Sequence, residues 1–487
     1  MPARGSPCPL LRRSGRNVLS VGGVRRAPME AEGPQPQTRD PKRCPPMPSS
    51  LVERLEWFRD LKFGLFMHWG PYSQWGCIES WPLVEEDTWA RPDDLPAWVE
   101  RDRDIERFKR DYYALNRTFD PTEFDPRPWA AAAKRAGMQY VVFTTKHHDG
   151  FCMFDTRQTD YRVTHPDCPF SGDPRADIAA EVFSTFRAEG FGIGVYFSKS
   201  DWHCPWYWSP DRPAKTRNPN YDTAAEPERW EQFVQFVHGQ IEELMTGYGP
   251  VDILWLDGGQ VRPPAQDIRM DEIAAMARRR QPGLIIADRT VGGEHENYLT
   301  PEQEVPDEPL LETPWESCIT MGDQWSFKPS DNYKRARDLI HLLIGVVAKG
   351  GNLLLNIGPQ PDGRFPEVAL ARLAEIGDWM QVNAEAIHGT RPWSPFAEGQ
   401  LRFTYSTRTP EKCYAVYLAA EGETRPPAEI ELPVLAHPAY PIHMLGVERE
   451  LEGRLGDDLG TVVRIPDEVI ANPPCEHAWV LRLREAN

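Results

Sequence analysis

An apolar run that stops abruptly at a cluster of polar residues recurs along most of this chain. The clearest case is the stretch 140–146, which is followed directly by His147, His148 and Asp149. Comparable runs that end in polar residues lie at 62–67, 192–197, 251–255 and 284–287, with a less clear example at 351–358. The length and composition of these runs are typical of buried strands. Because the carboxyl ends of parallel strands meet in one crevice, the pattern indicates a shared polar site more than a series of unrelated turns.

Helical stretches closed by glycine lie between these runs. The alanine-rich segment 129–136 ends at Gly137, and the segment 184–189 ends at Gly190. A repeat of strand, polar loop, helix and glycine is typical of βα units. The closed arrangement that brings every strand end to one mouth is a (β/α)₈-like TIM barrel, and we predict an α/β catalytic barrel of this kind over residues 51–391.

The two ends of the chain do not follow the βα pattern. A chain of 487 residues exceeds what one hydrophobic core usually spans, so a second domain is expected. From residue 392 to residue 487, short alternating segments separated by Pro, Gly and charged turns predict a C-terminal antiparallel β-sandwich. Residues 1–50 are rich in Pro, Arg, Gly and Ser, and we expect a disordered or misassigned N-terminal extension, with Met29 or Met47 as alternative starts.

Charge and cysteine content narrow the class of partners and the compartment. The net charge of −18 argues against nonspecific binding to nucleic acid or to an anionic membrane. Nine scattered cysteines without close pairs argue against a disulfide framework or a zinc ribbon and suit a reducing compartment. No apolar run is long enough for a signal peptide or a membrane span. We therefore expect a cytoplasmic protein that acts on neutral substrates and binds neither nucleic acid nor membrane; a homo-oligomer is left open.

Tryptophan is abundant near the predicted strand ends. The chain has 17 tryptophans, and those beside the strand-end loops are Trp69, Trp75, Trp81, Trp202, Trp206, Trp208, Trp255, Trp315 and Trp325. Sugars present apolar C–H faces that stack on aromatic rings, while their hydroxyls need directed hydrogen bonds. The alternative is that many of these rings are simply core. The combination favours a carbohydrate substrate.

Two acidic residues suit glycoside hydrolysis by a retaining mechanism, in which one carboxylate attacks the anomeric carbon and a second carboxyl group donates a proton. Asp257 is the candidate nucleophile, because it follows an apolar strand and precedes two glycines that allow close approach of a substrate. Among the carboxylates of the stretch 300–323, Glu316 has the least polar neighbours, and an apolar setting raises the pKa of a proton donor. A turn aspartate and a buried structural carboxylate are the respective alternatives.

Six segments, taken in order, carry a family resemblance. They are KFGLFMHWGPYS (62–73), TTKHHDGF (144–151), GVYFSKSDW (194–202), ILWLDG (253–258), WES (315–317) and NLLLNIGPQPDG (352–363). These segments resemble the successive signatures of the α-L-fucosidases of glycoside hydrolase family 29, and the resemblance covers about 55–393. It implies a (β/α)₈-like catalytic domain, a C-terminal β-sandwich, no metal or organic cofactor, and retaining hydrolysis of terminal α-linked L-fucose from a fucosylated oligosaccharide or glycoconjugate.

The resemblance also implies roles for individual residues. Asp257 matches the nucleophile, and Glu316 matches the acid/base of the Trp-Glu segment in one branch of the family. The residues that it implies for sugar binding are His68, His147, His148, Tyr196, Trp255, Arg289 and Glu79. An apolar pocket around the methyl group of fucose would reject galactose, because the additional hydroxyl would be left unpaired.

The chain departs from the family pattern in two places. Glu79-Ser80-Trp81 stands where the family often has a Glu-Trp pair, so the match of Glu79 is uncertain by one position. The acid/base varies in position between branches of the family, and Glu302 in YLTPEQ (298–303) is therefore the second candidate.

Two other functions stay open at this point. One is a barrel glycosidase of different sugar specificity, which would keep the nucleophile and change the pocket around the methyl group. The other is a noncatalytic carbohydrate-binding barrel, or a metal-dependent protein that uses His147, His148 and Asp257 as ligands. Metal ligation is disfavoured because no helix-borne histidine pair or cysteine cluster accompanies these residues.

Overall fold

The computed structural model describes residues 50–91, 103–457 and 460–485. The predicted N-terminal extension lies, apart from Ser50, outside the described residues. Ser50 caps helix α1 (Leu51–Leu61): its side-chain oxygen accepts the N–H of Glu53, and the Glu53 carboxylate accepts the N–H of Ser50. This capping box satisfies two backbone donors at once, so the helix begins at Leu51.

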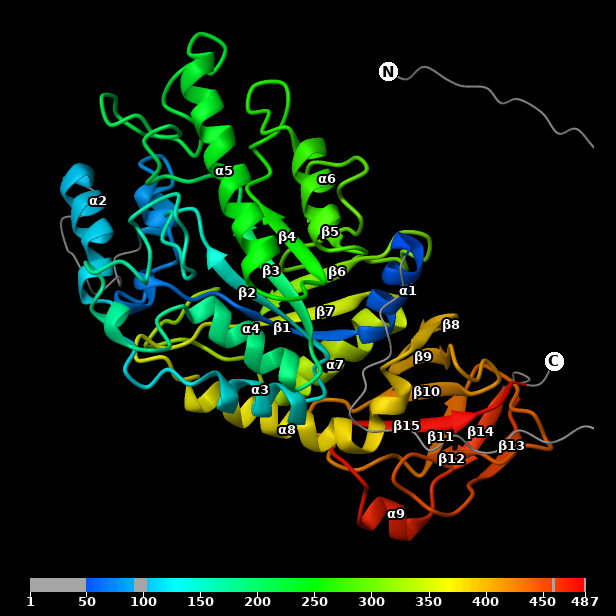
Figure 1. Cartoon of the computed structure of the whole chain (residues 1–487). Coiled ribbons are helices and arrows are strands. Elements are labelled where there is room, and N and C mark those ends of the chain that lie inside the picture. The colour runs from blue at the N-terminus through cyan, green and yellow to red at the C-terminus, as the bar shows by residue number, and fades with distance from the viewer. Residues whose placement is uncertain (1–49, 92–102, 458–459, 486–487) are drawn as a thin grey trace, which may run out of the picture. The chain divides into compact units, whose positions relative to one another are not determined.

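A seven-stranded parallel sheet forms the centre of the larger domain in the described part of the chain (Figure 1). Its strand order is β5-β4-β3-β2-β1-β7-β6. The strands are β1 (Phe63–Met67), β2 (Tyr140–Lys146), β3 (Gly192–Ser198), β4 (Ile253–Asp257), β5 (Ile285–Asp288), β6 (Glu316–Thr320) and β7 (Asn352–Ile357). Almost every strand residue is buried, as expected for a parallel sheet covered on both faces. Six of these strands were predicted; β6 was not, because charged residues and prolines surround it in the sequence.

Helices follow most strands, and all of them except α2, which packs against connecting loops, cover the outside of the curled sheet (Figure 1). They are α2 (Ile105–Tyr113), α3 (Pro126–Arg135), α4 (Ile178–Ala188), α5 (Pro227–Gly247), α6 (Met270–Arg280), α7 (Ala336–Ala348) and α8 (Glu367–Asn383). Short 3₁₀ helices occupy the connecting loops: η1 (Pro71–Gln74), η2 (Trp81–Leu83), η3 (Thr88–Ala90), η4 (Ala114–Thr118), η5 (Pro169–Gly172) and η6 (Ala384–Ala386). This alternation of strand and helix is the repeat of βα units that the sequence predicted.

An irregular segment, 297–303, occupies the gap between the two edge strands β5 and β6. On the β5 side, the N–H of Asn297 donates to the carbonyl of Ile286 at 2.9 Å, and the N–H of Ile286 donates to the side-chain oxygen of Asn297 at 2.8 Å. On the β6 side, the N–H of Glu316 donates to the carbonyl of Leu299 at 2.9 Å. The barrel wall is therefore completed by backbone contacts that do not form a regular eighth strand.

The interior of the barrel is filled by side chains from alternate strand positions, because successive side chains of a strand point to opposite faces. Phe66, Tyr140 and Trp255 belong to one buried cluster there. Gly64 makes room for this packing: a Cβ atom at Gly64 would lie 2.4 Å from the Cζ atom of Tyr140, closer than any side chain tolerates. The barrel is thus a packed core, and the space for a ligand lies at its carboxyl end.

The C-terminal domain consists of two antiparallel sheets, with strand orders β12-β15-β10-β9-β8 and β11-β14-β13. Its strands and its helix are β8 (Thr390–Glu398), β9 (Leu401–Ser406), β10 (Cys413–Leu418), β11 (Glu429–Leu432), β12 (His443–Met444), β13 (Glu452–Leu455), β14 (Thr461–Arg464), α9 (Asp467–Ala471) and β15 (Ala478–Leu483). Residues of both sheets, such as Phe403, Val463 and Trp479, share one core. The indole N–H of Trp379 on α8 donates to the carbonyl of Ala478 at 2.9 Å and ties the barrel to this domain. The prediction of a TIM-like barrel followed by a β-sandwich is confirmed, and the predicted boundary at 391/392 falls inside β8.

Membrane and disulfide features can be examined only in the described residues. No helix among them is long and apolar enough to cross a membrane. The seven cysteines among them, all buried or half-buried, form no disulfide with one another.

Candidate active site

A cavity of about 810 Å³ opens at the carboxyl ends of the barrel strands. Seven of the predicted sugar-binding or catalytic residues line it: His68, His147, His148, Tyr196, Trp255, Asp257 and Arg289. These residues come from five different strand ends, as the shared-crevice argument predicted. Glu302 also lines the cavity, whereas Glu316 and Glu79 do not belong to its lining.

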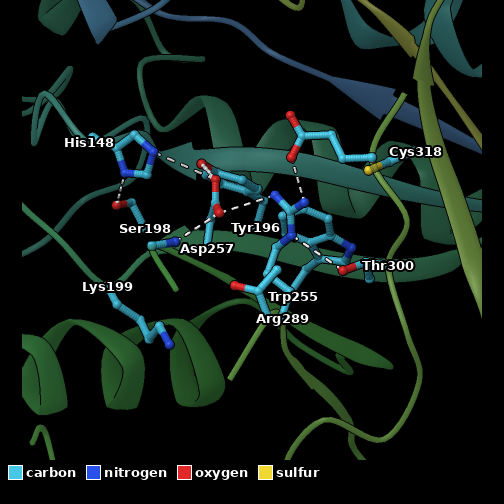
Figure 2. A network of polar contacts seen from close by, with 12 residues as sticks. His148, Tyr196, Ser198, Lys199, Trp255, Asp257, Arg289, Thr300 and Cys318 are labelled. Atoms are coloured by element: carbon cyan, nitrogen blue, oxygen red, sulfur yellow. Dashed lines mark hydrogen bonds and ion pairs between the residues drawn. The ribbon is translucent and has the colours of Figure 1, made fainter. Parts of the chain in front are cut away.

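Asp257, the last residue of β4, is held by hydrogen bonds to both carboxylate oxygens. Its Oδ2 accepts the hydroxyl of Tyr196 at 2.8 Å. Its Oδ1 accepts the N–H of Gly258 at 2.8 Å and an N–H of Arg289 at 3.2 Å (Figure 2). Gly258 has φ of +86°, a backbone conformation that residues other than glycine rarely adopt. This glycine therefore allows the backbone to turn back onto the carboxylate.

The charge state of Asp257 is set by its neighbours. Burial is the largest single influence and would raise the pKa of this carboxyl group, but the charge of the Arg289 guanidinium, together with His148, His147 and the Tyr196 hydroxyl, holds the pKa well below its usual range. The side chain of Asp257 is 17% exposed and faces the cavity. A buried carboxylate that stays ionised and accessible is suited to attack an electrophilic carbon.

Each cavity histidine is fixed in place through its Nδ1 atom. His68 Nδ1 lies 2.8 Å from Oδ1 of Asn356, and His147 Nδ1 lies 2.5 Å from Oγ of Ser80. His148 Nδ1 lies 2.5 Å from Oγ of Ser198. Burial lowers the pKa of all three rings, to about 4 for His68 and His148. The histidines are therefore neutral near pH 7 and act as hydrogen-bonding groups rather than as charges.

The partners of His68 and His148 also determine where the ring protons lie. The side-chain N–H₂ of Asn356 donates to the carbonyl of Trp325 at 2.6 Å, which leaves Oδ1 of Asn356 to accept from His68 Nδ1–H. Ser198 donates its hydroxyl proton to the carbonyl of Ser200 at 2.6 Å, so its Oγ accepts from His148 Nδ1–H. In the neutral rings the Nε2 atoms are left as acceptors, and acceptors are what the hydroxyl groups of a sugar need.

Trp255 and Arg289 form one side of the cavity (Figure 2). The guanidinium carbon of Arg289 lies 4.7 Å from the Trp255 ring centre, and the ring of Tyr196 stacks on the indole at 5.3 Å. Trp81 and Trp325 also line the cavity, whereas Trp69, Trp202 and Trp315 are buried. The tryptophans thus divide between a ligand surface and the core, as the two interpretations of the sequence allowed.

The two candidate acids have very different surroundings. Glu302 has a side chain that is 44% exposed, and its Oε2 accepts an N–H of Arg289 at 2.6 Å. One guanidinium therefore bridges Glu302 and Asp257 across the cavity. Glu316 is completely buried and is the first residue of β6, so it lies at the opposite end of its strand from the cavity. Its Oε2 accepts the hydroxyl of Tyr140 at 2.6 Å, and its Oε1 accepts the indole N–H of Trp255 at 3.1 Å.

Glu79 is also fully buried and outside the cavity lining. Its Oε1 accepts the backbone N–H of Ser326 at 2.6 Å, and burial raises the pKa of its carboxyl group to about 8. Its backbone φ of +33° is unusual for a residue other than glycine. The sugar contact predicted for Glu79 stays a prediction.

The donor set does not fit a metal ion well. Ligand atoms of His147, His148 and Asp257 lie within 4.8 Å of one another and could in principle surround an ion. However, the guanidinium of Arg289 already neutralises Asp257 at 3.2 Å, and a cation beside it would be repelled. The cluster is better suited to a neutral, hydroxyl-rich ligand.

Three positioning residues were not predicted: Ser80, Ser198 and Asn356. Ser198 and Asn356 lie on strands at interior-facing positions two residues beyond Tyr196 and Leu354. The period of two along each strand could have identified them as polar residues that face the site.

Comparison with known proteins places the chain in a family. The sequence model of the family described as alpha-L-fucosidase matches residues 35–385, well over half of the chain. The chain belongs to the α-L-fucosidase family. It is 27% identical to the tissue alpha-L-fucosidase of Rattus norvegicus over 460 residues, which cover 88% of this chain and 90% of the relative. It is 25% identical to the tissue alpha-L-fucosidase of Homo sapiens over 466 residues, which cover 92% and 93% of the two chains.

Solved structures give the same result for the fold of this α-L-fucosidase family member. Alpha-L-fucosidase isoenzyme 1 from Paenibacillus thiaminolyticus superimposes with a TM-score of 0.73 and 29% sequence identity, covering 90% of this chain and 100% of the other. The likeness extends over both the barrel and the C-terminal domain. The resemblance seen in the six sequence segments is therefore confirmed.

Proposed function

We propose that the chain is a retaining α-L-fucosidase that hydrolyses terminal α-L-fucosyl residues of glycans or glycosides. Membership of the α-L-fucosidase family supports L-fucose as the sugar that is released. The observation that carries the mechanism is the bridge from Arg289 to Asp257 at 3.2 Å and to Glu302 at 2.6 Å, because it holds two carboxyl groups together in the cavity. Retaining glycosidases separate the two carboxyl groups by about 5 to 5.5 Å, a span that one guanidinium can bridge.

In this proposal Asp257 is the nucleophile. One of its oxygens attacks the anomeric carbon as the bond to the leaving oxygen breaks, which gives a fucosyl-enzyme ester. The neutral histidines accept hydrogen bonds from the ring hydroxyls through their Nε2 atoms, and the Trp255 ring offers a stacking surface. The apolar edge formed by Phe66 and Trp325 suits the fucose methyl group, where galactose would leave a hydroxyl unpaired.

We assign the acid/base role to Glu302, in place of the first sequence-based choice, Glu316. An acid/base residue protonates the leaving oxygen and then takes a proton from water, so it must reach both the substrate and the solvent. Glu302 meets this requirement because it is 44% exposed and lines the cavity. Glu316 does not meet it, because both of its oxygens are occupied by buried donors.

The test is hydrolysis of 4-nitrophenyl α-L-fucoside by the wild type, Asp257→Ala, Glu302→Ala and Glu316→Gln, with and without azide. We expect the wild type to cleave and both alanine variants to lose activity that azide restores. Azide replaces the nucleophile in Asp257→Ala and gives inverted fucosyl azide, and it replaces the activated water in Glu302→Ala and gives retained fucosyl azide.

Each departure from this result has a definite meaning. Retained fucosyl azide from Glu316→Gln, with none from Glu302→Ala, would restore the sequence-based choice of acid. A wild type that is inactive on the fucoside but cleaves another aryl glycoside, such as a galactoside, would refute the fucose assignment and leave the two-carboxylate mechanism. A loss of wild-type activity on chelation would indicate a metal-dependent protein.

A further inference from the structure

Glu316 is a buried carboxyl group to which the proposed mechanism assigns no task. It is 0% exposed, and burial raises the pKa of its carboxyl group to about 7. Placing a carboxyl group in a barrel interior otherwise filled with apolar and aromatic side chains opposes folding unless the group is hydrogen-bonded. Glu316 has two such hydrogen bonds, one to Tyr140 and one to Trp255.

The two bonds connect residues at the amino ends of the barrel strands to a residue that lines the cavity. Oε2 of Glu316 accepts the hydroxyl of Tyr140, the first residue of β2, at 2.6 Å. Oε1 accepts the indole N–H of Trp255, at 3.1 Å. Tyr140 lies outside the cavity lining, but Trp255 belongs to it. Glu316 therefore contacts the Trp255 indole from the amino-terminal end of the barrel, while the same ring lines the cavity.

The orientation of Trp255 affects both charged groups of the proposed mechanism. Its ring packs under the guanidinium of Arg289 at 4.7 Å and stacks on Tyr196 at 5.3 Å. Arg289 and Tyr196 are the side chains that hold Asp257 (Figure 2). Apolar contacts with neighbouring rings are not directional enough to fix the rotation of an indole, whereas a hydrogen bond to its N–H is.

We propose that Glu316 is a positioning residue that anchors the Trp255 indole, and through it the sugar-stacking surface and the side chains around Asp257. The proposal rests on the proposed function for its kinetic test, since it concerns the same cavity. In this proposal Glu316 fixes the geometry of the site and does not transfer a proton.

Two substitutions of Glu316 distinguish a positioning role from a role in proton transfer. Glu316→Met has a similar shape but leaves the Trp255 N–H without an acceptor, whereas Glu316→Gln keeps a side-chain oxygen for it. We expect kcat/KM of Glu316→Met to fall about 10- to 100-fold, the effect of leaving a buried hydrogen-bond donor without an acceptor, and kcat/KM of Glu316→Gln to stay within about 3-fold of wild type. The loss in Glu316→Met should be the same for aryl fucosides with good and with poor leaving groups, and azide should not reverse it.

An acid/base role would give the opposite pattern. Glu316→Gln and Glu316→Met would be damaged equally, the damage would increase with the pKa of the leaving group, and azide would restore activity. Any of these three results overturns the proposal. If Glu316→Met does not fold, Glu316→Asp, which shortens the side chain by one methylene and withdraws the acceptor from Trp255, gives the same comparison with Glu316→Gln.

Tyr140→Phe is the matched control. It removes the other hydrogen bond of the same carboxyl group without touching the Trp255 anchor, so we expect kcat/KM within about 3-fold of wild type even if thermal stability falls. A loss as large as that of Glu316→Met would mean that the kinetic effect is a general consequence of a disturbed core, and the positioning role would be refuted.

A readout without catalysis keeps this proposal separate from the proposed function. In ¹⁵N-labelled protein the indole N–H resonance of Trp255 can be identified by its loss in Trp255→Phe. We expect this resonance to move and its hydrogen exchange to accelerate in Glu316→Met but not in Glu316→Gln. An unmoved resonance refutes the anchor whatever the enzyme hydrolyses, whereas a wild type inactive on every fucoside refutes only the proposed function.

Discussion

The Arg289→Met substitution tests whether the Arg289 guanidinium keeps the proposed nucleophile ionised. The guanidinium contacts Asp257 at 3.2 Å, and its side chain is only 8% exposed. Two unit charges about 4 Å apart interact by about 4 kcal/mol at an effective dielectric constant near 20, which corresponds to roughly three units on the pKa scale. Because burial raises the pKa of Asp257 and Arg289 is the largest influence that lowers it, removing the charge should raise this pKa strongly.

The assay is the pH dependence of kcat/KM on an aryl α-L-fucoside, which reports the ionisation of the free enzyme. The nucleophile must be ionised, so a raised pKa moves the acid limb of the profile upward, and activity is lost at acidic pH first. We expect an upward movement of roughly 2 to 3 pH units in Arg289→Met. Arg262→Met is the control, because Arg262 also lines the cavity but is exposed and donates to the carbonyl of Thr290. An acid limb that stays in place in Arg289→Met, or that moves equally in both variants, would refute the electrostatic argument.

Three further predictions concern stability. Gly64→Ala should lower the free energy of unfolding by about 1 to 3 kcal/mol in denaturant melts, because the new methyl group collides with the Tyr140 ring. Lys146→Met should lower it by about 3 to 5 kcal/mol, because Asp201, its partner at 3.0 Å, would be left buried without a counter-charge. Glu79, whose pKa burial raises to about 8, binds a proton in the folded state that the unfolded chain releases near pH 4, so its contribution to stability falls as pH rises from about 4 to 8. The Tm of Glu79→Gln relative to wild type should accordingly increase between pH 5 and pH 8.

Matched substitutions separate these effects from general damage. Gly172→Ala adds a methyl group where no atom lies within 4 Å and should change the free energy of unfolding by less than about 0.5 kcal/mol. Lys134→Met removes an exposed ion pair with Glu189 and should cost no more than about 1 kcal/mol. Equal losses in Lys146→Met and Lys134→Met would contradict the importance of burial, and a Tm difference for Glu79→Gln that does not change with pH would contradict the raised pKa.

The barrel was predictable because its strands are apolar runs with polar ends. Sequence alone placed Asp257, His68 and Arg289 at strand ends, and the structure brings them together in one cavity. Neither the 3.6-residue period of a helix nor the two-residue period of a strand was needed for this, since the direction of parallel strands determines which ends meet.

The sequence did not show the different positions of Glu316 and Glu302, the two candidates for the acid/base, because β6 lies in a charged stretch and was not predicted. Without that strand, Glu316 and Glu302 were two carboxylates of one apparent loop, and the less polar neighbours of Glu316 favoured it. The structure places Glu316 at the amino end of β6 and Glu302 beside the cavity. An apolar setting raises the pKa of a carboxyl group, but it does not show at which end of a strand that group lies. The period of two along β3 and β7 could have identified Ser198 and Asn356 as residues that face the site, but local sequence does not show which histidine each of them contacts.

The irregular segment 297–303 places the two carboxyl groups of the proposed catalytic pair in structural elements of different kinds. Asp257 is built into β4, where any change of register would displace the whole strand. Glu302 belongs instead to a segment outside the regular strands, which backbone contacts to β5 and β6 and the buried ring of Tyr298 hold in place, and such segments vary more readily than strands. The proposed proton donor can therefore change its position along the chain while the proposed nucleophile stays fixed in β4.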